Sequence, residues 1–256
     1  WACFMAAGRY DDPRWWPSPA ACAWQSAVAT ADGTRAAARA ATLRFMADPS
    51  ELERLYREGH MATDWHAVFL RRIVMDEAAL EVHLAEMYPG GRLTEPRYWR
   101  DARFNNPEQP VVGVSWYEAC AFALWLAAQS GRPFRLPTER EWEAAARGRE
   151  GRAYAFGNAF EPLWCNTSES HIWRPSPIGV FPEGDSPEGA CDLTGNVWEW
   201  TASVHDPGAS DASLAPDGRP PANGGAPAPR RVARGGAWDS PGAVARADVR
   251  DAVLPG

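Results

Sequence analysis

The chain of 256 residues is long enough to bury a sizeable hydrophobic core as one large domain. A formal net charge of -7 and a pI near 5.3 argue against a protein that binds nucleic acid or a membrane surface, because those partners attract clustered cations. All 26 basic residues are arginine, which excludes a Schiff-base lysine and a lysine that clamps phosphate. We therefore expect an unidentified protein or small molecule as the partner.

The five cysteines show neither a CxxC pair nor a zinc-type spacing, and their odd number argues against a complete disulfide framework. This pattern favours a reducing compartment, so we expect a cytoplasmic location. The chain has no signal peptide and no apolar run of about 18 residues, and it opens on Trp1 without an initiator methionine. We therefore expect a single domain over residues 1–256, truncated at both ends, in a protein with further domains. The cysteines are Cys3, Cys22, Cys120, Cys165 and Cys191.

The N-terminal third predicts helices and loops. Residues 1–16 have the pattern of a helix end followed by a proline-punctuated loop, with two adjacent tryptophans that can pack beneath it. Residues 21–93 are rich in Ala, Arg and Glu with helical periodicity, and they predict a helical insertion. Ser50 and Glu53 match a capping box that opens a helix ending near Glu58. A further helix is predicted over 76–87, with Ala79, Leu80, Val82, Leu84 and Met87 on its apolar face.

This insertion holds the histidines from which a metal site could be argued. His60 and His66 are six residues apart, so one helix face does not present both of them well. His83 lies in the next predicted helix. The favoured interpretation is that all three are solvent-exposed or capping side chains.

Two well-specified helices are predicted in the middle of the chain. Pro110–Val114 has the pattern of a buried strand, after which Ser115 caps a helix and Glu118 completes the capping box. Gly131 ends this helix. Cys120, Leu124 and Ala128 are expected along one side, and Phe122 and Trp125 widen the apolar surface.

The second helix begins after Thr138, which forms a capping box with Glu141, and it ends at Gly148. Trp142 and Ala146 are expected to face inward. The charged residues of this helix are interpreted as solvated-face and capping groups rather than catalytic acids: Glu139, Arg140, Glu141 and Glu143.

The stretch Asp192–Trp200 combines a turn, two tryptophans and carboxylates. Gly195 and Asn196 are a turn pair, because glycine accepts positive φ and asparagine tolerates it. The residues after them predict a strand with Trp198 and Trp200 on its core face. Glu199 would point the other way, where it could join Asp192 and turn carbonyls around a hard cation such as Ca2+. The alternative is a hairpin with a surface glutamate.

Residues 205–230 are rich in Pro, Gly, Ala, Asp and Ser and have almost no large apolar side chain. Such a segment cannot bury enough surface to offset the entropy of ordering it. It predicts a long, mobile surface loop.

Four motifs resemble the formylglycine-generating enzyme and sulfatase-modifying-factor family in the expected order. They are residues 110–119 (PVVGVSWYEA), 135–143 (RLPTEREWE), 195–200 (GNVWEW) and 234–238 (RGGAW). The resemblance is strong over about 98–204 and 230–256, weaker over 1–16 and absent between. It implies an irregular, loop-rich α+β fold of C-type-lectin type, with small antiparallel sheets, two packed helices and the helical insertion.

The resemblance also implies two calcium sites. In the first, Asn166 and the carbonyls of Thr167 and Ile172 would bind, and Ser170 stands where the family commonly has Asp, which weakens the site. The second maps well, with side-chain oxygens of Asp192 and Glu199 and the carbonyls of Gly195 and Val197. Carboxylates and carbonyls suit Ca2+, whereas Zn2+ would require His or Cys.

The family's copper-dependent activity is not expected here. It uses two cysteines shortly after the Arg-Gly-Gly turn, because cuprous ion is soft and binds thiolates, and the matching positions are Ser240 and Ala245. A second branch, the iron-dependent sulfoxide synthases, draws histidine ligands from a separate helical domain, and that histidine pattern is missing from this sequence. Motifs of serine hydrolases, P-loop proteins, zincins and dinucleotide-binding proteins are also missing.

The C-terminal segment, residues 234–256, resembles the ligand-facing part of non-catalytic family members, including variable proteins of diversity-generating retroelements. The hypothesis is a ligand- or protein-binding module, with an iron-dependent oxidase whose ligands lie partly outside this chain as the alternative, and a structural spacer as a third. Trp238, Arg246 and Arg250 would hold the frame. The residues assigned to ligand binding are Trp238, Asp239, Ser240, Pro241, Val244, Asp248, Val249, Asp251 and Ala252.

Overall fold

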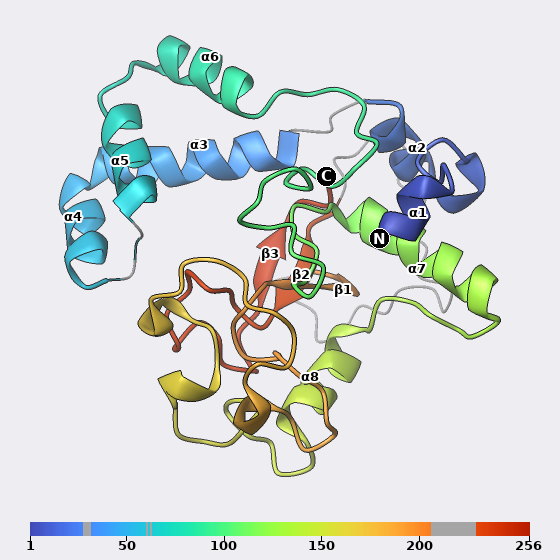
Figure 1. The fold of residues 1–256 in the computed structure, drawn as a ribbon. Coiled ribbons are helices and arrows are strands. Elements are labelled where there is room, and N and C mark those ends of the chain that lie inside the picture. The colour runs from blue at the N-terminus through green and yellow to red at the C-terminus, as the bar shows by residue number, and fades with distance from the viewer. Residues whose placement is uncertain (28–31, 60, 62, 206–228) are drawn as a thin grey trace.

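The computed structural model describes residues 1–27, 32–59, 61, 63–205 and 229–256. Within them, helices and irregular segments surround a three-stranded antiparallel sheet, so the predicted α+β class is confirmed (Figure 1). The sheet has the order β1 (Glu199–Val204), β2 (Arg231–Arg234) and β3 (Asp251–Val253). Glu199 lies opposite Arg234, and Val232 lies opposite Ala252. All four residues of the central strand β2 are buried.

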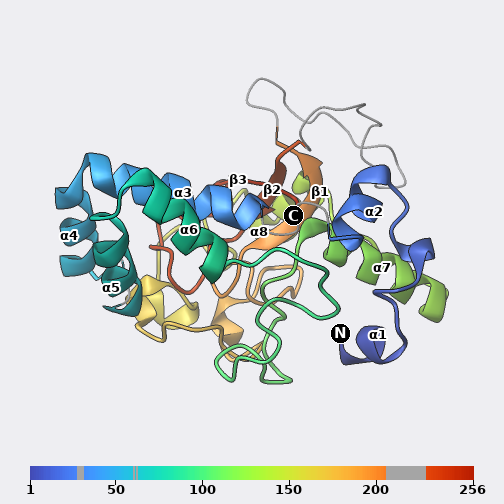
Figure 2. The same cartoon turned by 90° about the horizontal axis from the view of Figure 1, so that it is seen from above.

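The N-terminal segments pack against one helix of the C-terminal half. They are α1 (Ala2–Ala6), the 3-10 helix η1 (Pro13–Trp15) and α2 (Pro19–Gln25), and they lie beside α7 (Trp116–Ser130) in both views (Figures 1 and 2). The predicted helix end and loop are confirmed, and Trp16 is completely buried beneath that loop. The shared aromatic core is made of Phe4, Tyr10, Trp16, Ala21, Trp24, Trp116, Tyr117, Ala121 and Trp125.

The predicted capping box at Ser115 and Glu118 starts α7, and Gly131 ends the helix in a left-handed conformation. The predicted apolar side was wrong by a fraction of a turn, because Leu124 and Ala128 are exposed. The buried line is instead Tyr117, Ala121 and Trp125, where each residue lies four positions after the previous one. An all-apolar helix has no sharp periodicity, so its partners decide which side is covered.

The helices of the predicted insertion form a group at one side of the molecule (Figures 1 and 2). It contains α3 (Asp32–Ala47), α4 (Pro49–Arg57), α5 (Thr63–Arg72) and α6 (Glu77–Met87), and α3 contacts the other three. Asp48 caps α4 where Ser50 was predicted to do so, because Pro49 occupies the first helical position. On α6 the buried positions are Leu80 and Leu84, whereas the predicted face residues Ala79, Val82 and Met87 are exposed.

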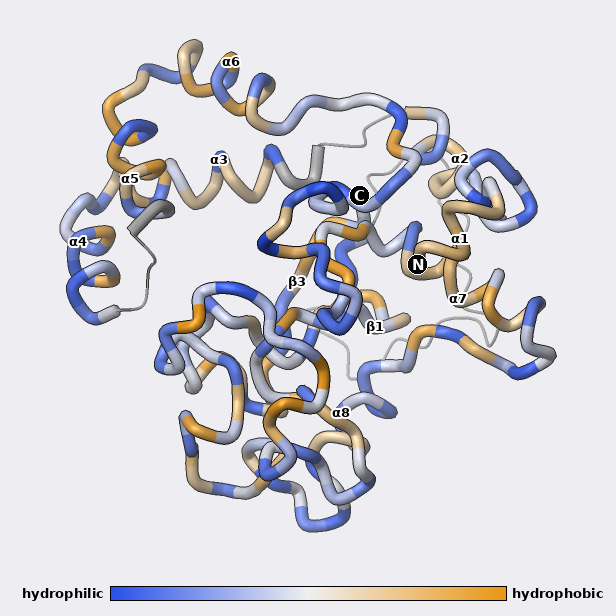
Figure 3. The backbone as a smooth tube through the Cα atoms, viewed as in Figure 1, coloured by the Kyte–Doolittle hydropathy of each residue, from blue (hydrophilic) through white to orange (hydrophobic). Residues whose placement is uncertain are grey.

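The remaining part is loop-rich and is built around α8 (Glu139–Arg147). Both partners of the capping box predicted at Thr138 and Glu141 are present. Three short 3-10 helices join it: η2 (Pro162–Trp164), η3 (Ser168–Ser170) and η4 (Pro182–Gly184). Trp142 and Ala146 face inward as predicted, and they pack with Ala155, Leu193 and Ala247. Figure 3 shows short hydrophobic stretches separated by hydrophilic ones in this part of the backbone.

Several predictions were wrong or fall outside the described residues. Pro110–Val114 is not a strand, because Gly113 has a φ of 71° and no neighbouring strand pairs with the segment. Most of the predicted loop over 205–230, from residue 206 to 228, lies outside the described part of the chain. All five cysteines are free thiols. Within the described ranges, no helix combines the length and apolar character needed to cross a lipid bilayer.

Candidate functional site

The turn at Gly195-Asn196 joins two distant parts of the chain. Both residues have positive φ, 79° and 63°, as the Gly-Asn pair predicts. The amides of Gly195 and Asn196 each donate a hydrogen bond of 2.7 Å, to the carbonyls of Gly235 and Asn166 respectively. A Cβ on Gly195 would lie only 2.2 Å from the Asn166 carbonyl oxygen. The turn therefore holds the loop at Asn166 against the glycine turn that follows β2.

In the first predicted calcium site, the Ser170 hydroxyl contacts oxygens that were assigned to the cation. Asn166 is 1% exposed, and its Oδ1 accepts a hydrogen bond of 3.0 Å from the Ser170 hydroxyl. The same hydroxyl lies 2.7 Å from the Thr167 carbonyl, to which it can also donate. Ile172 is exposed. Two of the oxygens assigned to the first calcium are therefore already paired with Ser170, and this donor set does not fit the cation well.

The second predicted site is centred on Glu199. Its Oε2 accepts a hydrogen bond of 2.5 Å from the indole of Trp142, and the residue is half-buried, unlike the surface glutamate of the alternative interpretation. Burial raises the pKa of Glu199 to about 7, and the negative charge of Asp192 adds to the rise. Burial also raises the pKa of Asp192, whose Oδ2 accepts a 3.2 Å hydrogen bond from the Gly179 amide. Burial is therefore the main factor that disfavours the ionised form of both carboxyl groups, and the charge of Asp192 adds to it at Glu199.

The second site fits a hard cation better than the first does. No described residue donates a hydrogen bond to the carbonyls of Gly195 or Val197. Asp185 adds negative charge near Asp192, and its buried Oδ1 has no hydrogen-bond partner. Yet no cluster of three or more His, Cys, Asp or Glu side chains in the described ranges is arranged to hold a metal. A cation here would depend on two carboxylates together with backbone carbonyls, which is a calcium-type set.

The positions that match the copper-binding cysteines lie under the glycine turn. Ser240 is 8% exposed and Ala245 is completely buried. The Ser240 hydroxyl accepts a hydrogen bond of 3.2 Å from the Ala237 amide, and its carbonyl accepts one of 3.0 Å from Ser168. Ser240 was predicted to be exposed, and that part of its assignment was wrong because its side chain closes the turn.

The other predicted ligand-binding residues divide between several neighbourhoods. Trp238 is half-buried, with its ring 5.8 Å from that of Phe104, whereas Asp239 beside it is exposed. Asp251 and Ala252 lie in β3, where Asp251 is exposed. Pro241, Val244 and Val249 are partly exposed, and Asp248 is exposed in an ion pair of 2.8 Å with Arg246.

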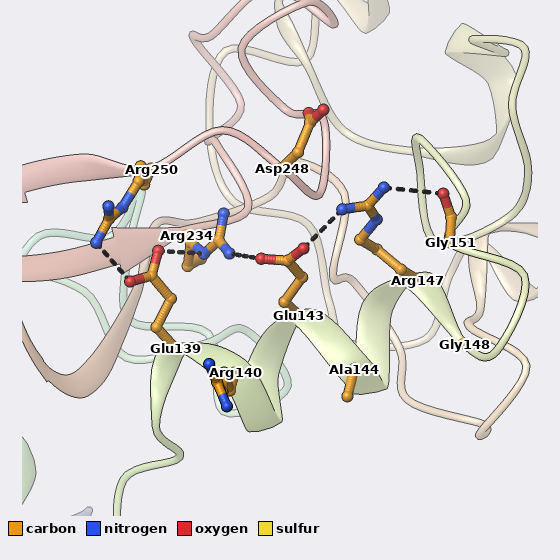
Figure 4. A pocket seen from close by; sticks show the side chains of 10 residues that line it. All are labelled: Glu139, Arg140, Glu143, Ala144, Arg147, Gly148, Gly151, Arg234, Asp248 and Arg250. Atoms are coloured by element: carbon orange, nitrogen blue, oxygen red, sulfur yellow. Dashed lines mark hydrogen bonds and ion pairs between the residues drawn. The ribbon is translucent and has the colours of Figure 1, made fainter. Parts of the chain in front are cut away.

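An alternating chain of charges, which we call the arginine–glutamate ladder, crosses from α8 to the C-terminal segment. Its order is Arg250, Glu139, Arg234, Glu143 and Arg147 (Figure 4). Arg250 pairs with Glu139 at 2.6 Å, and Glu139 pairs with Arg234 at 3.3 Å. Arg234, whose side chain is 1% exposed, also pairs with Glu143. Glu143 reaches Arg147 at 2.6 Å.

A cavity of about 630 Å³ lies over this ladder. One wall is the outward face of α8, with Glu139, Glu143 and Arg147 at successive turns of the helix. The other wall is the C-terminal segment with Asp248 and Arg250 (Figure 4). The cavity thus includes one residue predicted to bind ligand, Asp248, together with ladder residues that were interpreted as solvated.

The structure corrects the assignment of Glu139, which is 8% exposed and holds two arginines instead of lying on a solvated face. The sequence offered one signal that was not used. Arg234 opens the Arg-Gly-Gly motif inside a strand, and a buried arginine requires carboxylate partners. The spacing of Glu139 and Glu143 on α8 supplies those partners.

The histidines of the insertion do not form a metal site among the described residues. His66 is 9% exposed, pairs with Glu53 at 3.0 Å and stacks on the ring of Tyr56. It is therefore a buried packing residue, and the prediction that it is exposed or capping was wrong. His83 is half-buried, and His60 lies outside the described residues.

Comparisons with known proteins identify the family of this chain. Residues 56–256 match the sulfatase-modifying factor enzyme 1-like domain. "Inactive C-alpha-formylglycine-generating enzyme 2" of Mus musculus is 41% identical over 123 residues, which are 41% of this chain and 35% of that protein. "Hercynine oxygenase" of Mycolicibacterium thermoresistibile is 36% identical over 162 residues, 57% of this chain and 35% of that protein. The solved structure of "Treponema denticola variable protein 1" aligns with 22% identity and a TM-score of 0.48, and covers 58% of this chain and 66% of that one. The matched region thus spans about a third of the length of the two curated relatives.

Proposed function

This chain belongs to the family of the sulfatase-modifying factor enzyme 1-like domain. We propose that it is a non-catalytic ligand- or protein-binding module on the scaffold of that family. The observation that carries the proposal is the pair Ser240 and Ala245. A serine hydroxyl and a methyl group stand where the family's copper chemistry needs two thiolates. Both residues are buried under the glycine turn, and none of the five cysteines lies after Cys191.

The binding surface in this proposal is the C-terminal segment after Gly235-Gly236. It combines exposed side chains such as Asp239 and Asp248 with a rigid support, because the turn is tied to Asn196 and the ladder is tied to α8. Binding residues on a fixed frame lose less conformational entropy when a partner arrives. Asp248 also lines the cavity over the ladder, so a ligand could contact the segment and α8 together.

Calcium in this proposal has a structural role. Asp192, Glu199 and the carbonyls of Gly195 and Val197 would hold it, and bound Ca2+ would counter both the burial and the Asp192 charge that raise the pKa of Glu199. The cation would stiffen the turn that supports the glycine turn and the binding segment. The first site, with Ser170 in place, is left out of the proposal.

The experiment is a selection of peptides from a displayed random library on the immobilised chain, followed by binding measurements on variants. Asp239→Arg and Asp248→Arg should leave the melting temperature within a few degrees of the wild type and change the affinity for the selected peptides by about tenfold or more. Glu86→Arg is the matched control, because it makes the same charge change at an exposed position of α6. Loss of binding in the control, or unchanged binding in both test variants, would remove the C-terminal segment from the proposal.

The alternative function is an iron-dependent oxidase with ligands outside this chain. One observation favours it, namely the similarity to the hercynine oxygenase over 57% of this chain. Oxygen uptake with Fe2+ or Cu+ and a thiol substrate separates the two functions. Consumption that depends on the chain and the metal supports the oxidase, whereas no uptake together with specific peptide binding supports the module. No binding and no uptake would support a structural spacer.

A further inference from the structure

The arginine–glutamate ladder carries an excess positive charge. It contains three guanidinium groups and two carboxylates, so its net charge is one positive unit. Each inner member has an opposite charge on both sides, whereas the two end members, Arg250 and Arg147, have a carboxylate on one side only. The two ends are therefore the places where a further anion would be stabilised.

The Arg147 end is already completed within the chain. Its Nη2 donates to the Gly151 carbonyl at 3.0 Å, and its Nε donates to the Arg152 carbonyl at 3.0 Å. Arg147 also faces Asp248: the pKa of Asp248 is lowered mainly by its hydrogen bonds with Arg246, and the charge of Arg147 adds to that shift. The guanidinium of Arg147 therefore already has acceptors within the chain.

The Arg250 end is open. Its Nη2 donates to Glu139 Oε2 at 2.6 Å, and this is its one hydrogen bond to a described residue. Its side chain is 36% exposed, and it lines the cavity (Figure 4). A guanidinium has several N–H donors in a planar fork that matches a carboxylate. Arg250 therefore presents unused donors in the lining of a cavity of about 630 Å³.

The acceptors of the cavity are, in contrast, already engaged. Both oxygens of Glu139 contact arginines, and so do both oxygens of Glu143. Asp248 pairs through both oxygens with Arg246. A cationic ligand would have to compete with these arginines, whereas an anion would use free donors.

We propose that this cavity binds the carboxylate of an acidic ligand, with Arg250 as the anchoring residue. The inference rests on the proposed function and adds the ligand class to it. The incoming carboxylate extends the alternating ladder by one member, next to Arg250. The carboxylate belongs either to a small dicarboxylic acid or to a glutamate-rich peptide.

Calorimetric titration of the full chain tests the proposal with two probes, glutarate and a hexaglutamate peptide. Arg250→Gln should weaken the probe that binds by about tenfold, because it removes a charge-assisted hydrogen bond. Arg250→Lys keeps the positive charge but not the planar fork of N–H donors, so its affinity should lie between those of the wild type and Arg250→Gln. Arg100→Gln is the matched control, since Arg100 is also an arginine paired with one glutamate and its side chain is 84% exposed.

Each outcome decides the proposal. Binding that falls in Arg250→Gln and persists in Arg100→Gln supports it, and the stronger probe identifies the source of the carboxylate. An equal loss of affinity in Arg250→Gln and Arg100→Gln would mean that the probe binds through general charge attraction. If neither probe binds the wild type, an acidic ligand is excluded. Either result overturns the proposal. Melting curves of Arg250→Gln check that the fold is intact, with Arg250→Lys as the second variant. If peptides selected from the random library bind equally well to the Arg250 variants, the assignment of this cavity as the binding site is wrong. The proposal that the chain is a binding module would still hold.

Discussion

Glu118 is a carboxyl group that is completely buried within α7. It accepts hydrogen bonds from the Tyr10 hydroxyl at 2.6 Å and from the Ser115 amide at 2.7 Å. Burial raises the pKa of Glu118 from 4.5 to about 7, although these hydrogen bonds and the charge of Arg97 oppose the rise. Between those two pH values the folded chain keeps a proton that the unfolded chain has lost. The free energy of unfolding should therefore fall as pH rises through about 7.

Glu118→Gln should remove this part of the pH dependence. Its amide oxygen can still accept the bond from the Ser115 amide and cap the helix, while its NH2 group can donate to the Tyr10 hydroxyl oxygen. Urea unfolding of the wild type and the variant between about pH 5 and about pH 8 measures the effect. We expect a smaller decline of the unfolding free energy in the variant. Identical slopes in the two proteins would show that the carboxyl group titrates normally.

Ser170 determines, at the level of one side chain, whether the Asn166 loop depends on a cation. Ser170→Ala removes the donor to Asn166 and Thr167 and should cost about 1 to 2 kcal/mol, the same in calcium and in chelator. Ser170→Asp places a carboxylate among acceptor oxygens, so it should be destabilised in chelator and recover when Ca2+ is added. Thermal melting under both conditions is the measurement. A calcium response in Ser170→Ala that differs from the response of the wild type would contradict this account.

At the scale of elements, the Gly195 turn connects β1 to a loop that lies far away in sequence. Gly195→Ala should be strongly destabilising, because the added Cβ would lie 2.2 Å from a backbone carbonyl. Gly131→Ala is the matched control: it has a similar φ of 69°, but nothing lies within 4 Å of its added Cβ. The control should cost only the left-handed strain of about 1 to 2 kcal/mol. Equal losses of unfolding free energy in Gly195→Ala and Gly131→Ala, measured by urea unfolding, would mean that the positive φ alone requires glycine at position 195.

The ladder joins β2 to α8 through Arg234. Arg234→Met should destabilise the chain by about 3 kcal/mol or more, because Glu139 and Glu143 lose the buried cation between them. Arg246→Met is the control, since it breaks an ion pair with Asp248 in which both side chains are 41% exposed, and it should cost about 1 kcal/mol or less. Urea unfolding of both variants makes the comparison. Similar costs would show that the ladder does not couple the two elements.

At the scale of the whole molecule, calcium is expected to raise the melting temperature. A ligand that binds only the folded chain adds about 2.7 kcal/mol at a concentration of 100 times its Kd. Glu199→Gln should abolish this gain, yet it should not destabilise the chain in chelator because it removes a buried carboxyl with a raised pKa. Glu86→Gln should keep the gain. Melting in chelator and in calcium, with metal content by mass spectrometry, tests this; no calcium effect on the wild type would refute the assignment.

Local patterns predicted the parts of the fold that neighbours in sequence control. The capping boxes at Ser115 and Thr138 each pair residues three positions apart, so their outcome did not depend on the rest of the chain. The Gly195-Asn196 turn was predictable for the same reason, since positive φ is a property of those residue types. The family and the α+β class also follow from the sequence alone.

Only the tertiary structure decided which side chains meet. Glu139 and Arg234 are 95 positions apart, and their ion pair forms because β2 passes beside α8. Ser240 belongs to an exposed-looking segment, but the glycine turn folds it inward, where its hydroxyl closes the turn. Burial and pairing depend on segments that are distant in sequence. For this reason the sequence determined the family and the α+β class, whereas the cavity, the ladder and its open Arg250 end required the folded chain.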